Sequence, residues 1–447
     1  MSIGENQIKI INEAKSFLEK VDFSKIDSTL SSFCYFNSWA ETPGYARLKL
    51  KNQGSSFFIN FFKILFKNIL SIASHTKYIE INNKNSLKKY ESMILSWSFK
   101  KNFLPDGSFQ DRYFNQNSNN LAKSFWILIS MDGYVPSNLN DNIKIIKRKK
   151  GFFKYNFFSL IKILISTVVS CNFSVKKIYH SIFFHSYFAK LINKIIIKDI
   201  KENNFKSILL PYEAQPFQNN LFYKIKKINK KIINIGYLHS LSPLTCELIY
   251  RTGSPDLLLV HGNSQIKMLE TKLNWPKQKL FLIQSLRFNK NKSLSKKIFI
   301  PMAIHNFDIF LKEFKQLLED SPKNYFPKFI IQNHPTMSNS KKHNILKKEL
   351  EKLMEIYKDR FSENSNNENI SIFFGVTAAI LEALEKKINV IHICSDPIFQ
   401  SYSEQLWPNF KVKQLSKFTF NYNLNLSGKL INFGKNNTLN EVLKTIF

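Results

Sequence analysis

Short apolar runs bounded by polar turns recur along the chain from about residue 90, and helical patterns separate them. In the first half, strands are predicted at YESMILSWS, SFWILISMD, SILLPYEAQPF and IINIGYLHS, which span 90–98, 124–132, 207–217 and 232–240. Helical patterns cover 154–171, 178–203 and 217–230. Strands that alternate with helices at this spacing predict a parallel α/β sheet.

The same alternation begins again in the second half. Strands are predicted at 255–262, 297–304, 328–335, 370–374 and 388–396, and helices at 263–273, 306–319, 341–358 and 376–387. The chain is therefore predicted to hold two α/β domains of similar architecture, 86–250 and 251–447, with the break near RTGSPD at 251–256.

A helical extension, residues 1–85, is predicted ahead of the first domain. Its pattern is helical at both ends, and a segment with Gly and Pro interrupts it at 41–56. The polar run NNKNSLKK, 82–89, reads as the linker to the first domain. A length of 447 residues agrees with two domains and an appendage, because single cores stop growing near about 250–300 residues.

The formal net charge of +32 would ordinarily suggest a nucleic acid or an anionic surface as partner. Only six residues are arginines, and the other basic residues are lysines among abundant Ile, Asn and Phe, which is typical of an AT-biased coding sequence. Arginine is the better reader of bases and phosphates. The composition therefore argues against nucleic acid and favours attraction to an anionic lipid or an anionic donor.

Cysteine usage and the N-terminus predict a cytoplasmic protein. The cysteines stand far apart, without the spacing of metal ligands, among apolar or small residues: Cys34, Cys171, Cys246 and Cys394. The N-terminus carries charge from Glu5 onward and has no apolar core of signal-peptide type. No run reaches the roughly 18 apolar residues that a membrane span requires.

Two apolar stretches come nearest to a membrane segment, 57–73 and 157–171, but both contain lysines. The first is expected either to lie flat on a membrane, with its lysines at the headgroups, or to form a buried amphipathic helix. Both alternatives stay open, so peripheral contact with the inner face of a membrane is an expectation of the sequence.

In parallel α/β sheets, ligands bind outside the carboxyl ends of the strands, and this rule selects the candidate residues. In the second half these are Asn333, His334 and Pro335; Gly375, Val376 and Thr377; and Ser395, Asp396 and Pro397. In the first half they are Asp111, Arg112 and Tyr113 in a loop, Tyr212 and Glu213, and His239 and Ser240. Two sheets that face each other would bring these groups together.

The second-half residues predict an anion site. Thr377 stands where the residue before a helix is expected, and exposed amides at a helix start bind anions. His334 can donate a hydrogen bond to a phosphate, and Pro335 stiffens the backbone beside it. The alternatives are that Thr377 only caps the helix and that His334 is an ordinary loop histidine.

A buried strand is followed by QNHP, and about forty residues later comes the pattern strand–Gly–x–Thr–helix. This combination resembles the nucleotide-binding half of bacterial surface-carbohydrate glycosyltransferases of the GT-B type. The groups it resembles are the sialyltransferase-like and Kdo-transferase-like enzymes and the related polyol-phosphate polymerases. Segments of the first half, at 106–134 and 208–240, resemble the acceptor half of O-antigen or capsule biosynthesis proteins. One departure is that Gly375, Val376 and Thr377 supply a single hydroxyl where these families usually carry paired Ser or Thr.

The resemblance implies two Rossmann-like domains facing across a cleft, with the acceptor on the first and the nucleotide-sugar on the second. It implies transfer of a sugar from a nucleotide donor, CMP-linked and of Kdo or nonulosonate type, to a glycan or lipid-linked glycan, with no cofactor. The donor-binding residues would be Asn333, His334, Pro335, Gly375, Val376, Thr377 and Glu382, and the acceptor side would be Asp111, Arg112, Tyr113, Tyr212 and Ser240.

In such a reaction, His334 and the amides at Thr377 would stabilise the leaving phosphate. Glu213 is the first candidate for the base that activates the acceptor hydroxyl, and Pro211 and Tyr212 are expected to raise its pKa by limiting solvation. His239 is the second candidate. Glu213 could instead complement the dipole of the next helix. Asp111 and Arg112 are expected to pair as a loop clamp or to be unrelated.

Metal catalysis has no motif to support it, because the chain lacks an Asp-x-Asp pair at a strand end, His-Glu-x-x-His and a cysteine cluster. Neither a G-x-G-x-x-G nor a P-loop fingerprint is present, which argues against a dehydrogenase and a P-loop enzyme. Two alternatives remain: a CDP-polyol phosphotransferase of similar fold, and a noncatalytic shell that binds an anion or a lipid.

Overall fold

The structure is a computed structural model, and it describes residues 2–19, 77–82, 90–121, 123–149, 161, 165, 184–288, 293–335, 337–365, 367–425, 430–433, 439 and 441. The stretch 57–73 and almost all of 157–171 lie outside the described residues, as does most of the predicted extension. No described helix combines the length and apolar character that crossing a membrane requires. The described cysteines, Cys246 and Cys394, are free and buried.

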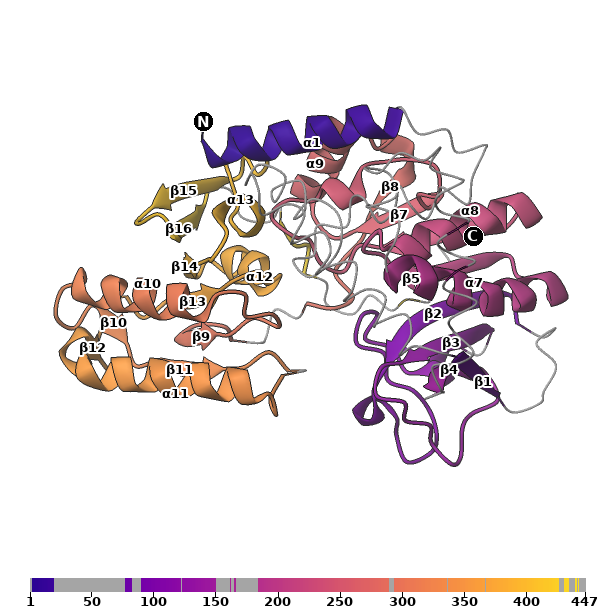
Figure 1. The fold of residues 1–447 in the computed structure, drawn as a ribbon, viewed down its shortest axis with the longest axis horizontal. Helices are drawn as coiled ribbons and strands as arrows, with labels where there is room; N and C mark the ends of the chain where they lie inside the picture. The colour runs from indigo at the N-terminus through magenta and orange to yellow at the C-terminus, as the bar shows by residue number, and fades with distance from the viewer. Residues whose placement is uncertain are drawn as a thin grey trace.

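The first sheet has the strand order β1-β4-β3-β2-β5-β6-β7-β8 (Figure 1). Its strands are β1 Lys77–Asn82, β2 Ser92–Ser98, β3 Ser124–Ser130, β4 Ile143–Lys149, β5 Ser207–Pro211, β6 Ile233–Tyr237, β7 Leu257–Val260 and β8 Leu280–Leu282. All neighbours pair in parallel except β1, which lies antiparallel to β4. The order from β4 to β7 is that of a doubly wound Rossmann-like sheet, with its switch point between β2 and β5.

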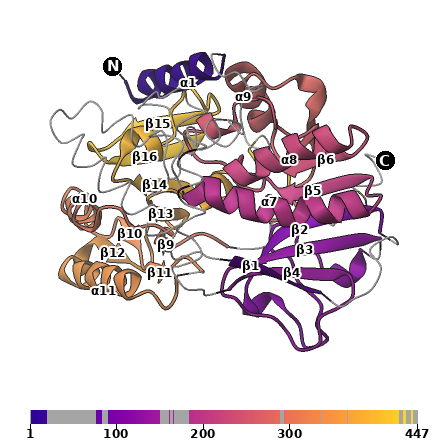
Figure 2. The same cartoon turned by 45° about the vertical axis from the view of Figure 1, so that its right-hand side comes forward.

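Apolar side chains bury both faces of this sheet, which is why its central strands read as continuous hydrophobic runs. On one face, Met93 and Phe125 pack with the helices α7 Phe184–Glu202 and α8 Pro216–Ile228, which lie together over the sheet (Figure 2). On the other face, Ile94 and Trp126 pack against the loop residues Phe109 and Phe114. That loop therefore forms part of the core.

The second sheet has the order β11-β9-β13-β14-β16-β15. Its strands are β9 Lys297–Phe299, β11 Ile330–Gln332, β13 Ile370–Phe374, β14 Asn389–Ile393, β15 Phe410–Gln414 and β16 Thr419–Leu424, and a small separate pair joins β10 Phe326–Pro327 to β12 Phe361–Ser362. The helices α10 Phe307–Glu319 and α11 Lys341–Ile356 cover one face through Phe310, Phe314 and Leu346. β11, β9, β13 and β14 are parallel.

Strand pairing corrects two predicted boundaries. β7 and β8 belong to the first sheet, so the change of sheet lies between Leu282 and Lys297 and not near residue 251. β1 also belongs to the first sheet, although it falls inside the predicted extension, 1–85. Both errors have one cause: the partner of a short strand is decided by contacts with distant segments, which the local pattern does not contain.

The two sheets are joined by one continuous hydrophobic cluster. It contains Leu258 and Leu269 of the first sheet's domain, and Ile380 and Tyr422 of the second. The elements that complete it are α9 Asn263–Leu273, the short helix η4 Cys246–Leu248, α12 Ala379–Glu385 and α13 Pro397–Gln400. Trp407 Nε1 donates across the join to the carbonyl of Pro243 at 3.2 Å. The pair of domains is therefore packed together and not merely linked.

Both ends of the chain cross this join. The helix α1 Ile3–Glu19 confirms the predicted N-terminal helix and lies across the top of the molecule against α13 and η4 (Figure 1). Its buried Gln7 donates to the carbonyls of Ile398 and Ser401 and accepts from Ser403. Near the C-terminus, Leu439 is buried in the cluster that covers the first sheet.

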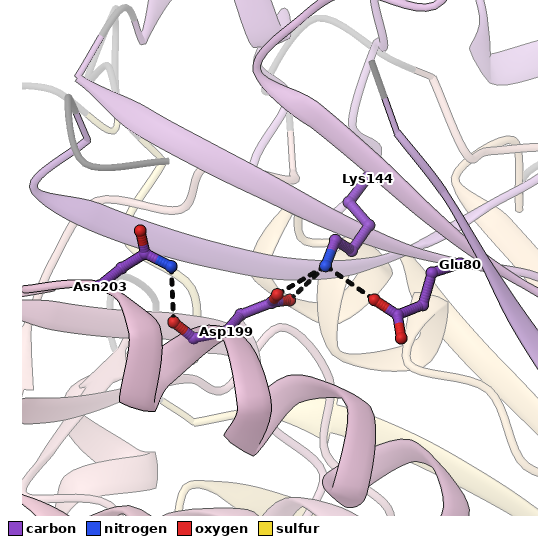
Figure 3. Close-up of polar contacts among 4 residues, drawn as sticks. All are labelled: Glu80, Lys144, Asp199 and Asn203. Carbon is purple, nitrogen blue, oxygen red and sulfur yellow. Dashed lines mark hydrogen bonds and ion pairs between the residues drawn. The ribbon is translucent and has the colours of Figure 1, made fainter. Parts of the chain in front are cut away.

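A buried lysine ties β1 and β4 to α7 (Figure 3). Lys144 Nζ donates to both oxygens of Asp199, at 2.6 and 2.7 Å, and to Glu80 Oε2 at 2.9 Å. Lys144 and Asp199 are both nearly inaccessible to solvent, whereas Glu80 is partly exposed. A buried charge requires such partners, so the three side chains fix the edge strand against the helix.

Candidate functional site

The carboxyl ends of β5, β6, β7 and β8 bring together the first group of candidate residues. Glu213 follows β5, His239 follows β6, His261 follows β7, and Arg287 follows β8. Because these strands are parallel neighbours, their carboxyl ends share one edge of the sheet. The two predicted bases, Glu213 and His239, are thus adjacent.

Glu213 and His239 form a direct pair. His239 Nε2 lies 3.1 Å from Glu213 Oε1, and Gln215 Nε2 donates to the other carboxylate oxygen at 2.7 Å. The Ser240 hydroxyl also lies 3.4 Å from His239 Nε2. A carboxylate only accepts hydrogen bonds, so Nε2 carries the proton in the neutral imidazole and Nδ1 carries the lone pair. The two candidates therefore act as a unit in which Glu213 orients His239.

His239 Nδ1 is buried and has no hydrogen-bond partner among the residues that the structure describes. The rings of Tyr113 and His239 pack in a T-shaped arrangement, with centroids 4.5 Å apart. A buried nitrogen with a lone pair and no donor costs free energy in the unliganded protein. A hydroxyl placed at Nδ1 would satisfy it, which is the geometry a general base requires.

The pKa of Glu213 corrects one expectation. Burial raises the pKa of this carboxyl, but the hydrogen bonds from His239 and Gln215 and the charges of His239 and Arg287 outweigh burial and hold it below its ordinary value. Burial lowers the pKa of His239, the Glu213 carboxylate opposes that effect, and Arg287 adds to it, so the pKa remains below 6.5. At neutral pH the pair consists of a carboxylate and a neutral imidazole.

The loop at 103–117 carries Asp111, Arg112 and Tyr113. Asp111 is buried and accepts hydrogen bonds from the amides of Tyr113 and Phe114, at 2.7 and 2.6 Å, and from the Ser96 hydroxyl. In the described part of the chain no hydrogen bond or ion pair joins Asp111 to Arg112, although their charges interact, so the predicted clamp is not a direct pair. Asp111 shapes the loop, and the exposed Arg112 is the residue that faces solvent.

Tyr212 does not lie on the acceptor side as predicted. Its side chain is fully buried, stacks on Phe222 and hydrogen-bonds Asn219 at 2.6 Å. When the side-chain amide of Asn219 is turned to satisfy both Tyr212 and Arg251, its oxygen accepts a hydrogen bond from Arg251. Tyr212 is therefore a core residue that supports the segment between β5 and α8.

The second group follows β11. Burial, followed by the charges of Arg287, His343 and Lys101, lowers the pKa of His334 to about 4. His334 is partly buried and therefore neutral at pH 7. Asn333 Nδ2 donates to Asn344 in α11 at 3.0 Å, so its amide is engaged by that helix. The carbonyl of Pro335 accepts a hydrogen bond from Lys101 Nζ at 3.3 Å, which links this segment to the first domain.

The third group follows β13. Gly375 has φ of +58°, and a Cβ at this position would lie 3.0 Å from Pro301, so glycine is required where the strand turns. Thr377 Oγ1 accepts from the amide of Ala379 at 3.3 Å, but the N-cap residue of α12 is Ala378, which makes no side-chain cap bond. Val376 is partly buried beside it. Glu382 is buried in α12 and paired with Lys386 at 2.6 Å, within its own helix.

Strand order separates His334 from Thr377. They follow β11 and β13, and β9 lies between these strands. Neighbouring strands stand about 4.8 Å apart, so the two backbones are about 9.5 Å apart at this edge. Part of the space between the two segments is occupied by His343, whose Nε2 lies 2.9 Å from the carbonyl of Pro301, just after β9. A ligand that meets both His334 and Thr377 must therefore be larger than one phosphate.

Arg287 connects the two groups. It is exposed, and its charge acts on Glu213, His239 and Tyr113 of the first domain and on His334 of the second. The bond from Lys101, which follows β2, to the carbonyl of Pro335, which follows β11, shows that the carboxyl edges of the two sheets lie beside each other. We call these residues the junction site: Lys101, Arg112, Tyr113, Glu213, His239, Arg287 and His334.

The sequence did not single out Arg287, Lys101 or His261. His261 is buried, its Nδ1 has no partner among the described residues, and burial with the charges of His239 and Arg287 lowers its pKa to about 3. It follows β7, so the strand-end rule would have found it. Arg287 and Lys101 lie in loops where no spacing marks them, although the scarcity of arginine gave a weak signal for Arg287.

Elsewhere in the described part of the chain, a hollow of about 580 Å³ is lined largely by asparagines, including Asn369, Asn389 and Asn423. It lies at the amino ends of β13 and β14, the opposite edge from the junction site. The described residues contain no group of three or more His, Cys, Asp or Glu side chains arranged to hold a metal ion.

No protein-family model matches the chain, and no curated protein matches it. Among solved structures it is similar to a glycosyltransferase from Rickettsia africae ESF-5, with 14% identity over 68% of this chain and 79% of that chain and a TM-score of 0.34. It is also similar to the N-terminal domain of trehalose-6-phosphate phosphatase from Candida albicans, with 10% identity over 70% and 84% of the two chains and a TM-score of 0.33. TM-scores below 0.5 fall short of a shared fold, so neither likeness decides fold or function.

Proposed function

We propose that the chain is a metal-independent glycosyltransferase of the GT-B type. It would move a sugar from a nucleotide donor, CMP-linked and of Kdo or nonulosonate type, to a hydroxyl of a glycan or lipid-linked glycan of the cell surface. The observation that carries the proposal is the Glu213–His239 pair, on a sheet edge that the bond from Lys101 to the carbonyl of Pro335 brings beside the His334 segment, with Arg287 in electrostatic range of both. A cationic group for the leaving phosphate and a base for the acceptor thus share one site.

In the proposed reaction, the acceptor hydroxyl gives its proton to His239 Nδ1 while its oxygen bonds to the anomeric carbon of the sugar. The bond from that carbon to the donor phosphate breaks, and its electron pair leaves with the nucleotide. Glu213 holds the imidazole in the required tautomer and stabilises the imidazolium that forms. Tyr113 packs on His239 and would line the place where the acceptor binds.

Negative charge develops on the phosphate as the bond breaks, and preorganised donors stabilise that charge. Arg287 and His334 are assigned to this role. His334 is neutral at pH 7 because burial and neighbouring cations lower its pKa to about 4, so it acts as a hydrogen-bond donor and not as a fixed charge. Gly375, Val376 and Thr377 stand two strands away and would contact another part of the donor.

The proposal is tested by incubating the protein with CMP-, CDP-, UDP- and GDP-linked donors and measuring nucleotide release. Release of CMP from a CMP-sugar, abolished in His334→Ala with the fold intact by circular dichroism, supports it. Release of CMP from a CDP-polyol would indicate the phosphotransferase instead. A protein that releases no nucleotide, is not stabilised by millimolar CMP and binds anionic vesicles would be a noncatalytic lipid-binding shell.

A further inference from the structure

We infer that the acceptor carries an anionic group, a phosphate or a carboxylate, which Arg112 binds. The inference rests on the function proposed above and adds the chemical class of the second substrate. It starts from the position of Arg112 in the loop that meets the proposed base. Tyr113, the next residue, packs on His239 with ring centroids 4.5 Å apart. Arg112 is exposed beside this contact.

The backbone under Arg112 is fixed, so its position does not depend on a ligand. The buried Asp111 accepts from the amides of Tyr113 and Phe114 and from Ser96. Because the backbone is already ordered, binding of a ligand has to order only the Arg112 side chain. The loop therefore presents a guanidinium at the acceptor side of the site in the unliganded protein.

A second cation is held close to Arg112. Asn102 and Gln110 exchange two hydrogen bonds, at 2.8 and 3.1 Å, which join the segment that carries Lys101 to the segment that carries Arg112. Lys101 and Arg112 lie within electrostatic range of each other. No described carboxylate forms an ion pair with either of them, although surface lysines elsewhere in the chain have such partners. The buried Asp111 lies within electrostatic range of Arg112, but its carboxylate accepts from Ser96, Tyr113 and Phe114, so the exposed guanidinium stays open to an external anion.

The donor does not account for both cations. Lys101 donates to the carbonyl of Pro335, next to His334, and therefore stands on the donor side. With Arg287 and His334, the donor phosphate already has three cationic or hydrogen-bonding neighbours. Arg112 lies within electrostatic range of Lys101 but is the cation that adjoins Tyr113, which packs on the proposed base His239. A guanidinium suits the planar, two-oxygen face of a carboxylate or a phosphate, so the acceptor supplies that group.

The test uses the full chain with 1 mM CMP, so that the donor side is occupied, and titrates three probes by calorimetry: methyl glucoside, methyl glucoside 6-phosphate and methyl glucuronide. The two anionic probes distinguish phosphate from carboxylate. At least one of them is expected to bind about tenfold or more tightly than the neutral glucoside, an advantage that falls as salt is added. In Arg112→Gln the advantage should fall below about threefold, and Arg112→Lys should keep part of it.

Lys206→Gln is the matched control, because it removes the same charge at the amino edge of the first sheet, where Lys206 forms an exposed pair with Glu91. It should leave the preference for anionic probes unchanged.

Equal or undetectable binding of all three probes, or an unchanged preference in Arg112→Gln, overturns the inference. So does weaker CMP binding in Arg112→Gln, which would assign Arg112 to the donor. Failure of the wild type to bind CMP contradicts the proposed function instead, and the same titrations without CMP still decide the role of Arg112.

Discussion

His239 Nε2 lies 3.1 Å from Glu213 Oε1, and this contact joins the loops that follow two neighbouring strands, β5 and β6. The pair fixes which imidazole nitrogen carries the proton and leaves Nδ1 as the base. His239→Gln should therefore lower kcat by about 10²–10⁴-fold, the usual contribution of a general base. Thermal unfolding and CMP affinity should change little, and both are measured beside the rate.

The pH profile separates the roles of Glu213 and His239. The active imidazole is neutral, so the rate should rise as pH rises through the pKa of His239, which lies below 6.5, and level off by neutral pH. Glu213 raises the pKa of His239, so in Glu213→Gln the acid limb should move to lower pH while a reduced rate remains. If Glu213 were itself the base, Glu213→Gln would abolish the rate at every pH.

Arg287 should contribute to donor binding and shift the same pH profile in the opposite direction. A charge-assisted hydrogen bond contributes about 1.5–3 kcal/mol, so Arg287→Gln should weaken CMP binding by roughly 10–100-fold, measured by calorimetry. Its charge lowers the pKa of His239, so the acid limb of the rate should move to higher pH in this variant. Lys206→Gln serves as the charge-matched control, and equal CMP affinity in both variants would remove Arg287 from the site.

Asp111 should make stability depend on pH between about 4 and 6. Burial raises its pKa from 3.8 to about 6, so the folded protein binds the proton more tightly than the unfolded chain does. This stabilisation is present below pH 3.8 and is lost as pH rises through 6, a change of about 3 kcal/mol in the free energy of unfolding. Urea unfolding across this range measures it.

Asp111→Asn is the matched test, because an amide oxygen can still accept from the amides of Tyr113 and Phe114 but does not titrate. Relative to the wild type, the variant should gain stability as pH rises from 4 to 6. Parallel curves for the two proteins would mean that Asp111 titrates at its ordinary pKa in the fold.

The apolar central strands could be read from the sequence, but strands at a sheet edge or next to it could not. SMILSWS and SFWILIS are buried on both faces and therefore stand out as hydrophobic runs. β4, IKIIKRK, and β15, FKVKQ, mix lysines with apolar residues and were missed. Lys144 in β4 is buried only because Asp199 and Glu80 receive its charge, and that partnership joins segments 55 and 64 residues away.

The candidate site was predictable where one rule sufficed. Glu213, His239 and His334 follow parallel strands, and the strand-end rule selected each of them. Their pairing and charge state were not predictable, since the pKa of Glu213 depends on His239, Gln215 and Arg287. Tyr212 was misplaced because the sequence does not show which way a side chain points once a strand has ended.

The triad of Lys144, Asp199 and Glu80 allows a stability prediction that is independent of function (Figure 3). Lys144→Met keeps the length of the side chain but leaves Asp199 buried without its cation, and should lower the free energy of unfolding by about 3–5 kcal/mol. Adding Asp199→Leu removes the unpaired charge and should recover most of that loss, because a buried ion pair is often no more stabilising than apolar packing. Glu80→Gln, at the partly exposed partner, should cost under about 1 kcal/mol. Urea unfolding of the wild type and the three variants checks these values. If the double variant were no more stable than Lys144→Met, the cost would come from lost packing and not from the uncompensated carboxylate.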